Sequence, residues 1–284
     1  MRISNTSSKT NFTRAGILGL GLIGGSWARA LKQRGVRVVA SDESKSSVAA
    51  HDAGVVDELV KSPQGFEGCD VLLLCSPPTV VCETLPKLTG LNIGLVTDVC
   101  SVKESIMAAA QCLTNFIGGH PMAGSHTSGF AASNANLFAN APYILCVPEN
   151  CALPHQRITA FEKLLADMNA NILHMTPEEH DKSVATVSHL PHAAAFALAR
   201  VALAQPGALR MAGRGFADTT RIADSSPALW TDILMSSPHL LPTFSQYISE
   251  LSELSNLLSR RDATAIEKFL SAGPVCRAEL RGAK

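Results

Sequence analysis

Short apolar runs alternate with amphipathic segments of helical length from Arg14 to about Met175. This alternation predicts βαβ units, in which parallel strands form a sheet that helices cover on both faces. Gly35 and Gly54 follow the first two helical segments, at the place where a helix commonly ends. The expected strands are Ala15–Leu20, Val36–Ala40, Val71–Cys75, Leu95–Asp98, Phe116–Gly118, Tyr143–Val147 and Asn171–Met175.

The strand-like alternation ends at Thr176-Pro177, and helical segments follow. Thr176, Pro177 and the two acids after them stand in the order of a helix cap, a first-turn proline and first-turn acids. We therefore expect a domain boundary here. The predicted fold is an α/β domain with a doubly wound parallel sheet over residues 1–176, followed by an all-helical domain over residues 177–284.

The charges of the chain balance, with 24 basic and 24 acidic residues among 284. A domain that binds DNA or RNA through its phosphates carries a basic excess, so no nucleic-acid partner is expected. The first fourteen residues contain no apolar run typical of a secretion signal, and nowhere do 18 apolar residues follow one another. We expect a cytoplasmic chain without a membrane span. The 8 cysteines are irregularly spaced, which predicts neither structural disulfides nor a cysteine zinc site.

A glycine-rich turn, Gly19-Leu20-Gly21-Leu22-Ile23-Gly24, directly follows the first expected strand and opens the first helix. Glycines at this spacing allow a tight turn, close approach of a pyrophosphate and close packing of helix on strand. The N-terminus of the helix then faces the phosphates. The sequence therefore predicts a Rossmann-type dinucleotide site with contacts from Gly19, Gly21, Leu22, Ile23 and Gly24.

Asp42 ends the second expected strand. An acid at this place accepts hydrogen bonds from the ribose hydroxyls and repels a 2′-phosphate, which favours NAD over NADP as cofactor. Lys45 nearby keeps NADP open as an alternative. A second alternative is a glycine-rich turn without a ligand, in which Asp42 caps the helix that starts near Ser44.

Four later clusters, at residues 98–103, 118–125, 188–192 and 215–223, combine polar residues with turn-forming ones. In doubly wound sheets, ligands bind at the carboxyl ends of the strands, and the first two clusters follow expected strands. His120 in the second cluster is a candidate general base, since the ordinary pKa of a histidine lies near neutral pH. A loop histidine that bonds only to the backbone is the alternative.

The four clusters hold the motifs Asp-x-x-Ser-Val-Lys, Gly-x-His-Pro-Met-Ala-Gly, Ser-His-Leu-Pro-His and Gly-Phe-x-Asp-x-Thr-Arg-Ile-Ala. Together with Gly19–Ser26, they make the chain resemble the prephenate/arogenate dehydrogenase family over essentially its whole length. The resemblance implies an N-terminal NAD domain and a helical domain that forms a homodimer. It also implies oxidative decarboxylation of prephenate to 4-hydroxyphenylpyruvate in tyrosine biosynthesis, or, as the alternative, of arogenate to tyrosine.

By this resemblance, His120 takes up the proton of the substrate hydroxyl, and Ser101 orients that histidine and the nicotinamide. Arg221 holds a substrate carboxylate, a role that suits its bidentate fork. The further residues expected at the substrate are His192, His189, Ser125, His126, Asp218 and Trp230, and those expected at the cofactor include Ser76 and Asp98.

Several of these residues have a plainer structural interpretation. Residues 189–192 could form a helix kink that holds one core histidine, Trp230 could be a core residue, and Asp98 or Lys103 could cap the next helix. A metal site made of His180 with the two later histidines is not expected, because no carboxylate stands at a known ligand spacing from them.

The chain departs from its relatives at two positions near the expected substrate site. Ala217 stands where many relatives carry Lys or Arg, and Arg214 is the nearest cation that could replace it. His126 stands where many relatives carry an acid. Because a pocket acid would favour the ammonium group of arogenate, its loss favours prephenate as substrate.

Two other functions fit parts of the sequence. One is a dimeric dinucleotide sensor whose cleft is catalytically silent, and the other is a different hydride-transfer enzyme that acts on a hydroxyacid. The presence of both His120 and Arg221 argues against the sensor, and the His-Pro-Met-Ala-Gly loop argues against the second.

Overall fold

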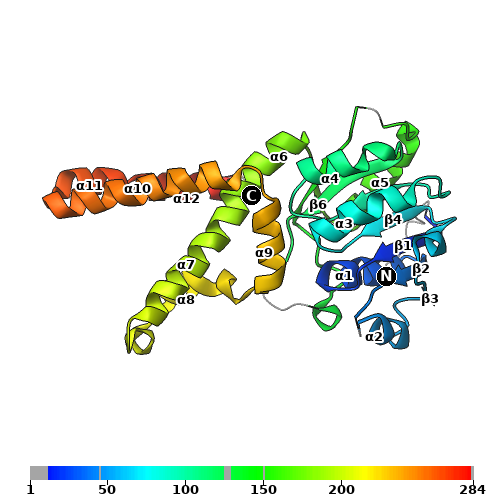
Figure 1. Cartoon of the computed structure of the whole chain (residues 1–284), viewed down its shortest axis with the longest axis horizontal. Coiled ribbons are helices and arrows are strands. Elements are labelled where there is room, and N and C mark those ends of the chain that lie inside the picture. The colour runs from blue at the N-terminus through cyan, green and yellow to red at the C-terminus, as the bar shows by residue number, and fades with distance from the viewer. Residues whose placement is uncertain (1–11, 45, 125–128, 150, 283–284) are drawn as a thin grey trace, which may run out of the picture. The chain divides into compact units, whose positions relative to one another are not determined.

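The strands form one eight-stranded sheet with the order β3-β2-β1-β4-β5-β6-β7-β8. The structure is a computed structural model that describes residues 12–44, 46–124, 129–149 and 151–282 (Figure 1). The strands are β1 (Arg14–Leu18), β2 (Arg37–Ser41), β3 (Glu58–Leu59), β4 (Val71–Leu74), β5 (Val96–Asp98), β6 (Phe116–Pro121), β7 (Pro142–Cys146) and β8 (Asn171–His174).

Six of the seven strand pairs are parallel, and β6 and β7 run antiparallel. The sheet is thus mainly parallel, as predicted, and this pair is the exception. The described residues between β6 and β7 contain a single 3-10 turn, η4 (Phe130–Ala132), and no crossover helix to carry the chain back across the sheet. β3 was not predicted, because a strand of two residues has no apolar run that marks it.

Helices cover both faces of the sheet, as the alternation predicted. Ile17 and Leu73 point to the face where Trp27 and Phe161 pack with their rings stacked at 6.1 Å. Leu72, beside Leu73 in the same strand, points to the opposite core. The helices of this part are α1 (Leu22–Lys32), α2 (Ser46–Asp52), α3 (Pro78–Thr84), α4 (Glu104–Ala109) and α5 (His155–Asp167).

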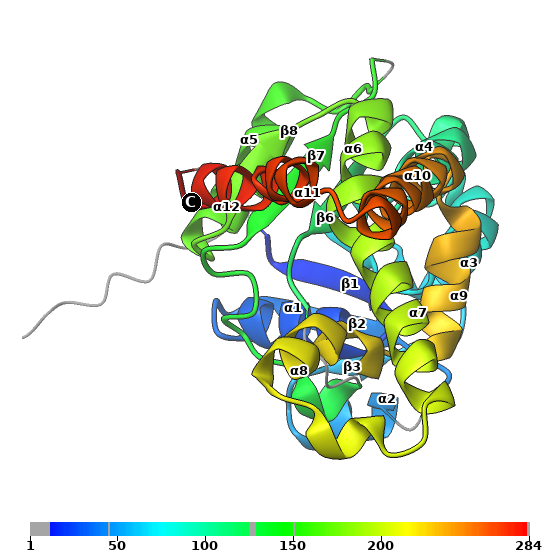
Figure 2. The ribbon, with the colours of Figure 1, turned by 90° about the vertical axis from the view of Figure 1, so that its left-hand side faces the viewer.

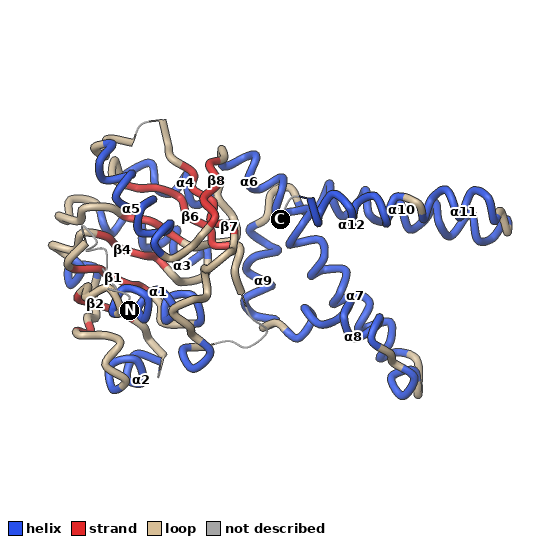
Figure 3. The backbone as a smooth tube through the Cα atoms, turned by 180° about the vertical axis from the view of Figure 1, so that it is seen from behind, coloured by secondary structure: helices blue, strands red, loops and turns tan. Residues whose placement is uncertain are grey.

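The described chain after β8 is helical, which confirms the predicted fold class (Figure 3). The chain divides into two compact units, residues 1–238 and residues 239–284. The predicted domain boundary at residue 176 falls inside the first unit and stays a prediction. The helices after β8 are α6 (Pro177–Val184), α7 (Leu190–Ala204), α8 (Arg214–Thr220), α9 (Pro227–Ser236), α10 (Leu240–Arg260), α11 (Ala263–Leu270) and α12 (Ala272–Gly282).

A π-helical turn, η5 (Ala185–His189), joins α6 to α7 in one helical run, which passes close to β6 (Figure 2). Pro191, in the first turn of α7, has no N–H for the carbonyl four residues before it. A π turn widens the helix at this point and is a common device at functional sites. The predicted kink is therefore a π turn that precedes the proline.

The run Pro177–Ala204 is 28 residues long and apolar enough, by length and composition, to cross a membrane. It also carries three polar side chains, His180, Asp181 and His189, that are buried in the protein. A face that buries charged and polar groups belongs to the protein interior. Val187, Val201 and Leu203 of the same run are exposed.

The start of α6 generates the first testable prediction. Thr176 accepts a hydrogen bond from the N–H of Glu179, whose side chain accepts one from the N–H of Thr176 in return, which makes a capping box. Thr176→Ala should lower the free energy of unfolding by about 1 kcal/mol. The midpoint of urea unfolding, followed by helical circular dichroism, measures it. Thr176→Ser keeps the hydroxyl and should match the wild type; an equal loss in both variants would contradict the cap.

Candidate active site

A cavity of about 590 Å³ lies at the carboxyl ends of β1, β4, β5 and β6, where the sequence predicted the ligands to bind. Its other walls come from α7 and from residues 221–233. The predicted site residues that line it are Gly21, Leu22, Ile23, Ser76, Ser101, His120, His192, Arg221 and Trp230. Those described outside its lining are Gly19, Gly24, Asp42, Asp98, His189 and Asp218. Ser125 and His126 lie outside the described residues.

The glycine-rich turn has the geometry that a dinucleotide pyrophosphate requires. Gly19 has φ +92°, and a Cβ on it would stand 2.6 Å from the carbonyl oxygen of Cys75. A Cβ on Gly24 would stand 1.9 Å from the carbonyl oxygen of Gly19, whereas one on Gly21 would meet nothing within 4 Å. Gly21 caps α1 without a side-chain hydrogen bond. The first N–H groups of α1 therefore face the cavity beside open space, which fits a pyrophosphate.

Asp42 holds the glycine-rich turn from the end of β2. Its Oδ2 accepts the N–H of Leu20 at 2.5 Å, and its Oδ1 accepts the N–H of Ser44 at 2.7 Å as well as the Ser44 hydroxyl. The carboxylate thus makes the local bond to Ser44 that the plainer interpretation expected, and a second bond that fixes the turn. Its contact with a ribose stays a prediction.

His120 is the next-to-last residue of β6 and is bonded to a second histidine. Its Nδ1 lies 2.8 Å from Nε2 of His180, and Nδ1 of His180 lies 2.7 Å from Oδ1 of Asp181. The carboxylate of Asp181 also accepts the N–H groups of Lys103 at 2.7 Å and Glu104 at 2.9 Å. His120 is 6% exposed, and His180 is fully buried. Nε2 is therefore the ring nitrogen of His120 that is left for a ligand in the cavity.

The surroundings keep His120 neutral. Burial lowers its pKa well below the ordinary value of 6.5, and His180, Lys103 and His189 act in the same direction. Burial alone would raise the pKa of Asp181, but its hydrogen bonds from His180 and from the two backbone amides hold that pKa below its usual value. At neutral pH, His120 is therefore uncharged and Asp181 is ionised. An uncharged imidazole can accept a proton, as a general base must.

Asp98 lies beneath the cavity, although the prediction placed it against the cofactor. Its carboxylate is fully buried, pairs with the ammonium of Lys103, and accepts the N–H groups of Cys100 at 2.9 Å and Gly119 at 3.0 Å. These bonds use both oxygens within the protein. Lys103 occupies the N-cap position of α4, as the plainer interpretation allowed, but makes no side-chain capping bond. Asp181 accepts the N–H groups of Lys103 and Glu104 in its place.

The wall opposite the sheet carries the residues predicted at the substrate. The rings of His192 and Trp230 stack at 3.5 Å and 19°, and Nδ1 of His192 donates to the carbonyl of Ser188 at 2.9 Å. Burial lowers the pKa of His192, the bond to Ser188 opposes this, and Arg221 lowers it further. A neutral His192 thus presents Nε2 near the guanidinium of Arg221.

Two residues predicted at the substrate, His189 and Asp218, do not line the cavity. His189 is fully buried with Nδ1 at 2.9 Å from the hydroxyl of Ser237, and its pKa is lowered to about 4, mainly by burial. It is a buried core histidine, as in the plainer interpretation, but among the described residues only its Nδ1, and not its buried Nε2, has a hydrogen-bond partner. Asp218 is exposed on α8, and the described side chains form no ion pair between it and Arg221. Arg214 is exposed on the same helix and does not line the cavity in place of a cation at Ala217.

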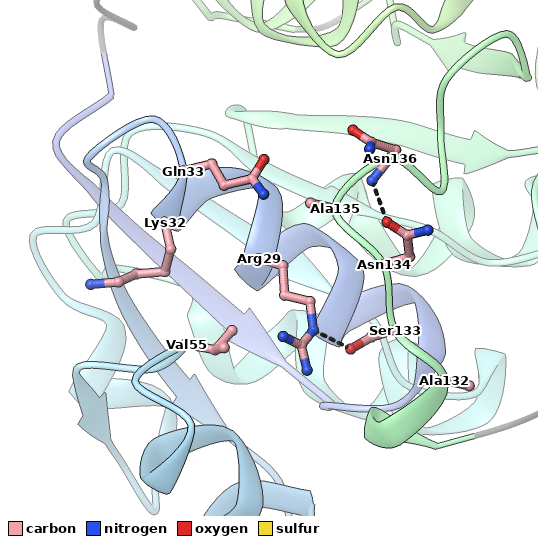
Figure 4. Close-up of a pocket in the computed structure, with 9 residues that line it drawn as sticks. All are labelled: Arg29, Lys32, Gln33, Val55, Ala132, Ser133, Asn134, Ala135 and Asn136. Carbon is pink, nitrogen blue, oxygen red and sulfur yellow. Dashed lines mark hydrogen bonds between the residues drawn. The ribbon is translucent and has the colours of Figure 1, made fainter.

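A second hollow lies against α1 and shares no lining residue with the cavity (Figure 4). Arg29 donates to the hydroxyl of Ser133 at 2.8 Å and lies over the ring of Phe130. Lys32 pairs with Asp57 at 2.7 Å. Because these cations already have partners within the protein, the hollow carries no functional prediction.

Two models of known protein families match the chain, one to each part of it. Residues 27–174 match the model of the prephenate dehydrogenase nucleotide-binding domain, and residues 176–272 match that of the prephenate dehydrogenase dimerization domain. The chain belongs to the prephenate dehydrogenase family. This confirms the resemblance seen in the motifs.

Individual members of the prephenate dehydrogenase family align along most of the chain. Prephenate dehydrogenase of Lactococcus lactis is 33% identical over 92% of this chain and 75% of its own length. The structure of prephenate dehydrogenase from Aquifex aeolicus with hydroxyphenyl propionate and NAD⁺ has a TM-score of 0.84 and 31% identity, covering 94% of this chain and 98% of that one. Synechocystis arogenate dehydrogenase has a TM-score of 0.79 and 30% identity, covering 94% and 100%.

The buried ion pair under this site gives the second prediction. Lys103→Met leaves Asp98 buried without its cation, which should lower the free energy of unfolding by about 3–5 kcal/mol. Lys182→Met is the matched control, because Lys182 forms an exposed ion pair with Glu178 and should change stability little. Chemical unfolding of both variants provides the comparison. Equal effects would mean that the Asp98–Lys103 pair has no special weight.

Proposed function

We propose that this chain is an NAD-dependent oxidoreductase that converts prephenate to 4-hydroxyphenylpyruvate and carbon dioxide in tyrosine biosynthesis. The observation that carries the proposal is the placement of a neutral His120, with Nδ1 already bonded, in one cavity with the glycine-rich turn and Arg221. The family membership and the NAD⁺-bound relative support the cofactor and the substrate class. A cytoplasmic location accompanies the proposal.

The residues divide the chemistry between them. Bound NAD supplies the hydride acceptor. Nε2 of His120 accepts the proton of the ring hydroxyl, which raises the electron density at the carbon that loses hydride. Arg221 binds a carboxylate through its fork of N–H donors, and the stacked His192 and Trp230 form a wall for the ring. Loss of the ring carboxylate as carbon dioxide restores aromaticity and drives the reaction forward.

Arogenate is the second candidate substrate, because the Synechocystis arogenate dehydrogenase is about as similar as the prephenate enzymes. The two substrates differ in the side chain, which is a ketoacid in prephenate and an amino acid in arogenate. Steady-state rates with each substrate, each with NAD and with NADP, test the proposal. The proposal requires the highest kcat/KM with prephenate and NAD; no turnover in any combination would exclude it.

We propose further that two copies of the chain associate through the helical region. Residues 176–272 match a dimerization-domain model. Apolar side chains of η5, α7 and α9 stand exposed in the single chain, among them Val187 at 66%, Val201 at 69%, Leu203 at 72% and Met235 at 83%. Exposed apolar side chains of this size are typical of a surface that another protein chain covers, and a second copy of this chain would bury them.

His120→Asn tests the base. The variant should lower kcat by about 10²- to 10⁴-fold and leave the dissociation constant of the substrate nearly unchanged. In the wild type, His120 can accept a proton only while it is neutral. Because its pKa lies well below 6.5, kcat/KM should stay constant as the pH falls past 6.5 and should drop only when the pH reaches the lowered pKa. A full rate in the variant would show that another group is the base.

Arg221→Ala tests the carboxylate contact. Loss of a charge-assisted bidentate bond should raise KM by about 10- to 100-fold, with a smaller effect on kcat. Arg214→Ala removes an exposed arginine of α8 that does not line the cavity, and should leave both constants close to the wild type. If both variants raised KM equally, the loss of one positive charge anywhere on the surface would explain the result, and a direct contact of Arg221 with the substrate would be excluded.

A further inference from the structure

We infer that His180, anchored by Asp181, is a positioning residue that fixes the tautomer of His120 with the proton on Nδ1 and the lone pair on Nε2. The inference rests on the proposed function, in which His120 is the base. His180 and Asp181 touch neither the cavity nor a ligand in it, since both are buried behind His120. Any effect of His180 and Asp181 on the reaction is therefore transmitted through the hydrogen bond to His120.

The direction of the hydrogen bonds is set at Asp181. Its Oδ1 accepts the N–H of Lys103 and faces Nδ1 of His180, and its Oδ2 accepts the N–H of Glu104. Backbone N–H groups can only donate, so both carboxylate oxygens must act as acceptors. The same bonds hold the pKa of Asp181 below its usual value, which keeps the carboxylate ionised. Asp181 is thus a fixed acceptor at the end of the chain of bonds.

A fixed acceptor determines each proton that follows it. Nδ1 of His180 has to carry a proton in order to donate to Asp181. In the neutral form that we propose for this fully buried ring, Nε2 is then the acceptor. The partner of this Nε2, at 2.8 Å, is Nδ1 of His120, which must therefore donate. The remaining nitrogen of His120, Nε2, has its lone pair free for a substrate hydroxyl. The opposite tautomer would place two lone pairs or two protons face to face within the buried pair.

The neighbouring charges leave this arrangement intact. The charged and titratable groups around the pair are Lys103 with its partner Asp98, His189 at the end of η5, and Arg221 across the cavity. The Lys103 ammonium already pairs with Asp98, and His189 bonds to Ser237. Neither supplies His120 with an alternative acceptor for its Nδ1 proton. His180 is therefore the group that selects the tautomer.

The tautomer can be observed directly in the wild-type protein. Two-bond ¹H–¹⁵N spectra of protein labelled at histidine separate a protonated Nδ1 from a protonated Nε2, and the His120→Asn variant assigns the signals of His120. We expect the Nδ1-protonated form above neutral pH. The Nε2-protonated form would overturn the inference whether or not the enzyme turns over prephenate, so this result is separate from the test of the proposed function.

Two substitutions at the same position test the consequence for the rate. His180→Leu removes the acceptor and should lower kcat by about 10²-fold with little change in KM. His180→Gln places a carboxamide oxygen where Nε2 stood, which can accept from His120, and should restore kcat to within about tenfold of the wild type. His174→Leu is the control, because His174 on β8 is exposed and pairs with Glu162 outside the cavity.

The comparison of the two variants separates positioning from packing. If His180 only filled space, Leu and Gln would lower stability and kcat together, and the signals of His120 would keep one tautomer in both. We expect a mixed or reversed tautomer in His180→Leu and the wild-type tautomer in His180→Gln. Equal kcat in both variants, or an unchanged tautomer in folded His180→Leu, would overturn the inference.

Discussion

The carboxylate of Asp181 joins parts of the chain that are far apart in the sequence. It belongs to α6, accepts the amides of Lys103 and Glu104 after β5, and reaches His120 at the end of β6 through His180. Because the donors around it are backbone amides, the bonds fix the position of α6 against the sheet as well as the direction of each proton. The first two turns of α6 are therefore fixed to the strand that carries the predicted base.

A second buried carboxylate organises the same edge from beneath. Asp98 accepts the amide of Cys100, next to Ser101, and the amide of Gly119, next to His120. One side chain therefore holds both the loop after β5 that carries the predicted serine and the end of β6 that carries the predicted base. Its partner Lys103 neutralises it without being exposed to the cavity. The charges of Asp98 and Lys103 thus support the geometry of the site and leave the binding of anions to other groups.

The sequence predicted the features that local patterns determine. The glycine spacing at Gly19–Gly24 reflects close contacts with Cys75 and with the turn itself, and the capping box at Thr176 reflects bonds within one turn. The antiparallel β7 and the bond between His120 and His180 depend on contacts between distant residues, which no local pattern encodes. A His-Asp pair in the first turns of a helix was visible, but its meaning required the partner 60 residues away.

The balanced charge of the chain leaves the attraction of an anionic substrate to individual groups at the site. With equal numbers of acids and bases, no general field attracts an anionic substrate, so individual groups must do so. The first amides of α1 face the place of the pyrophosphate, which needs no side-chain cation there. Lys103 is neutralised by Asp98, and burial keeps His192 largely uncharged. Among the described residues that line the cavity, Arg221 is then the one permanent positive charge, which makes it the natural partner for the carboxylate of the proposed substrate.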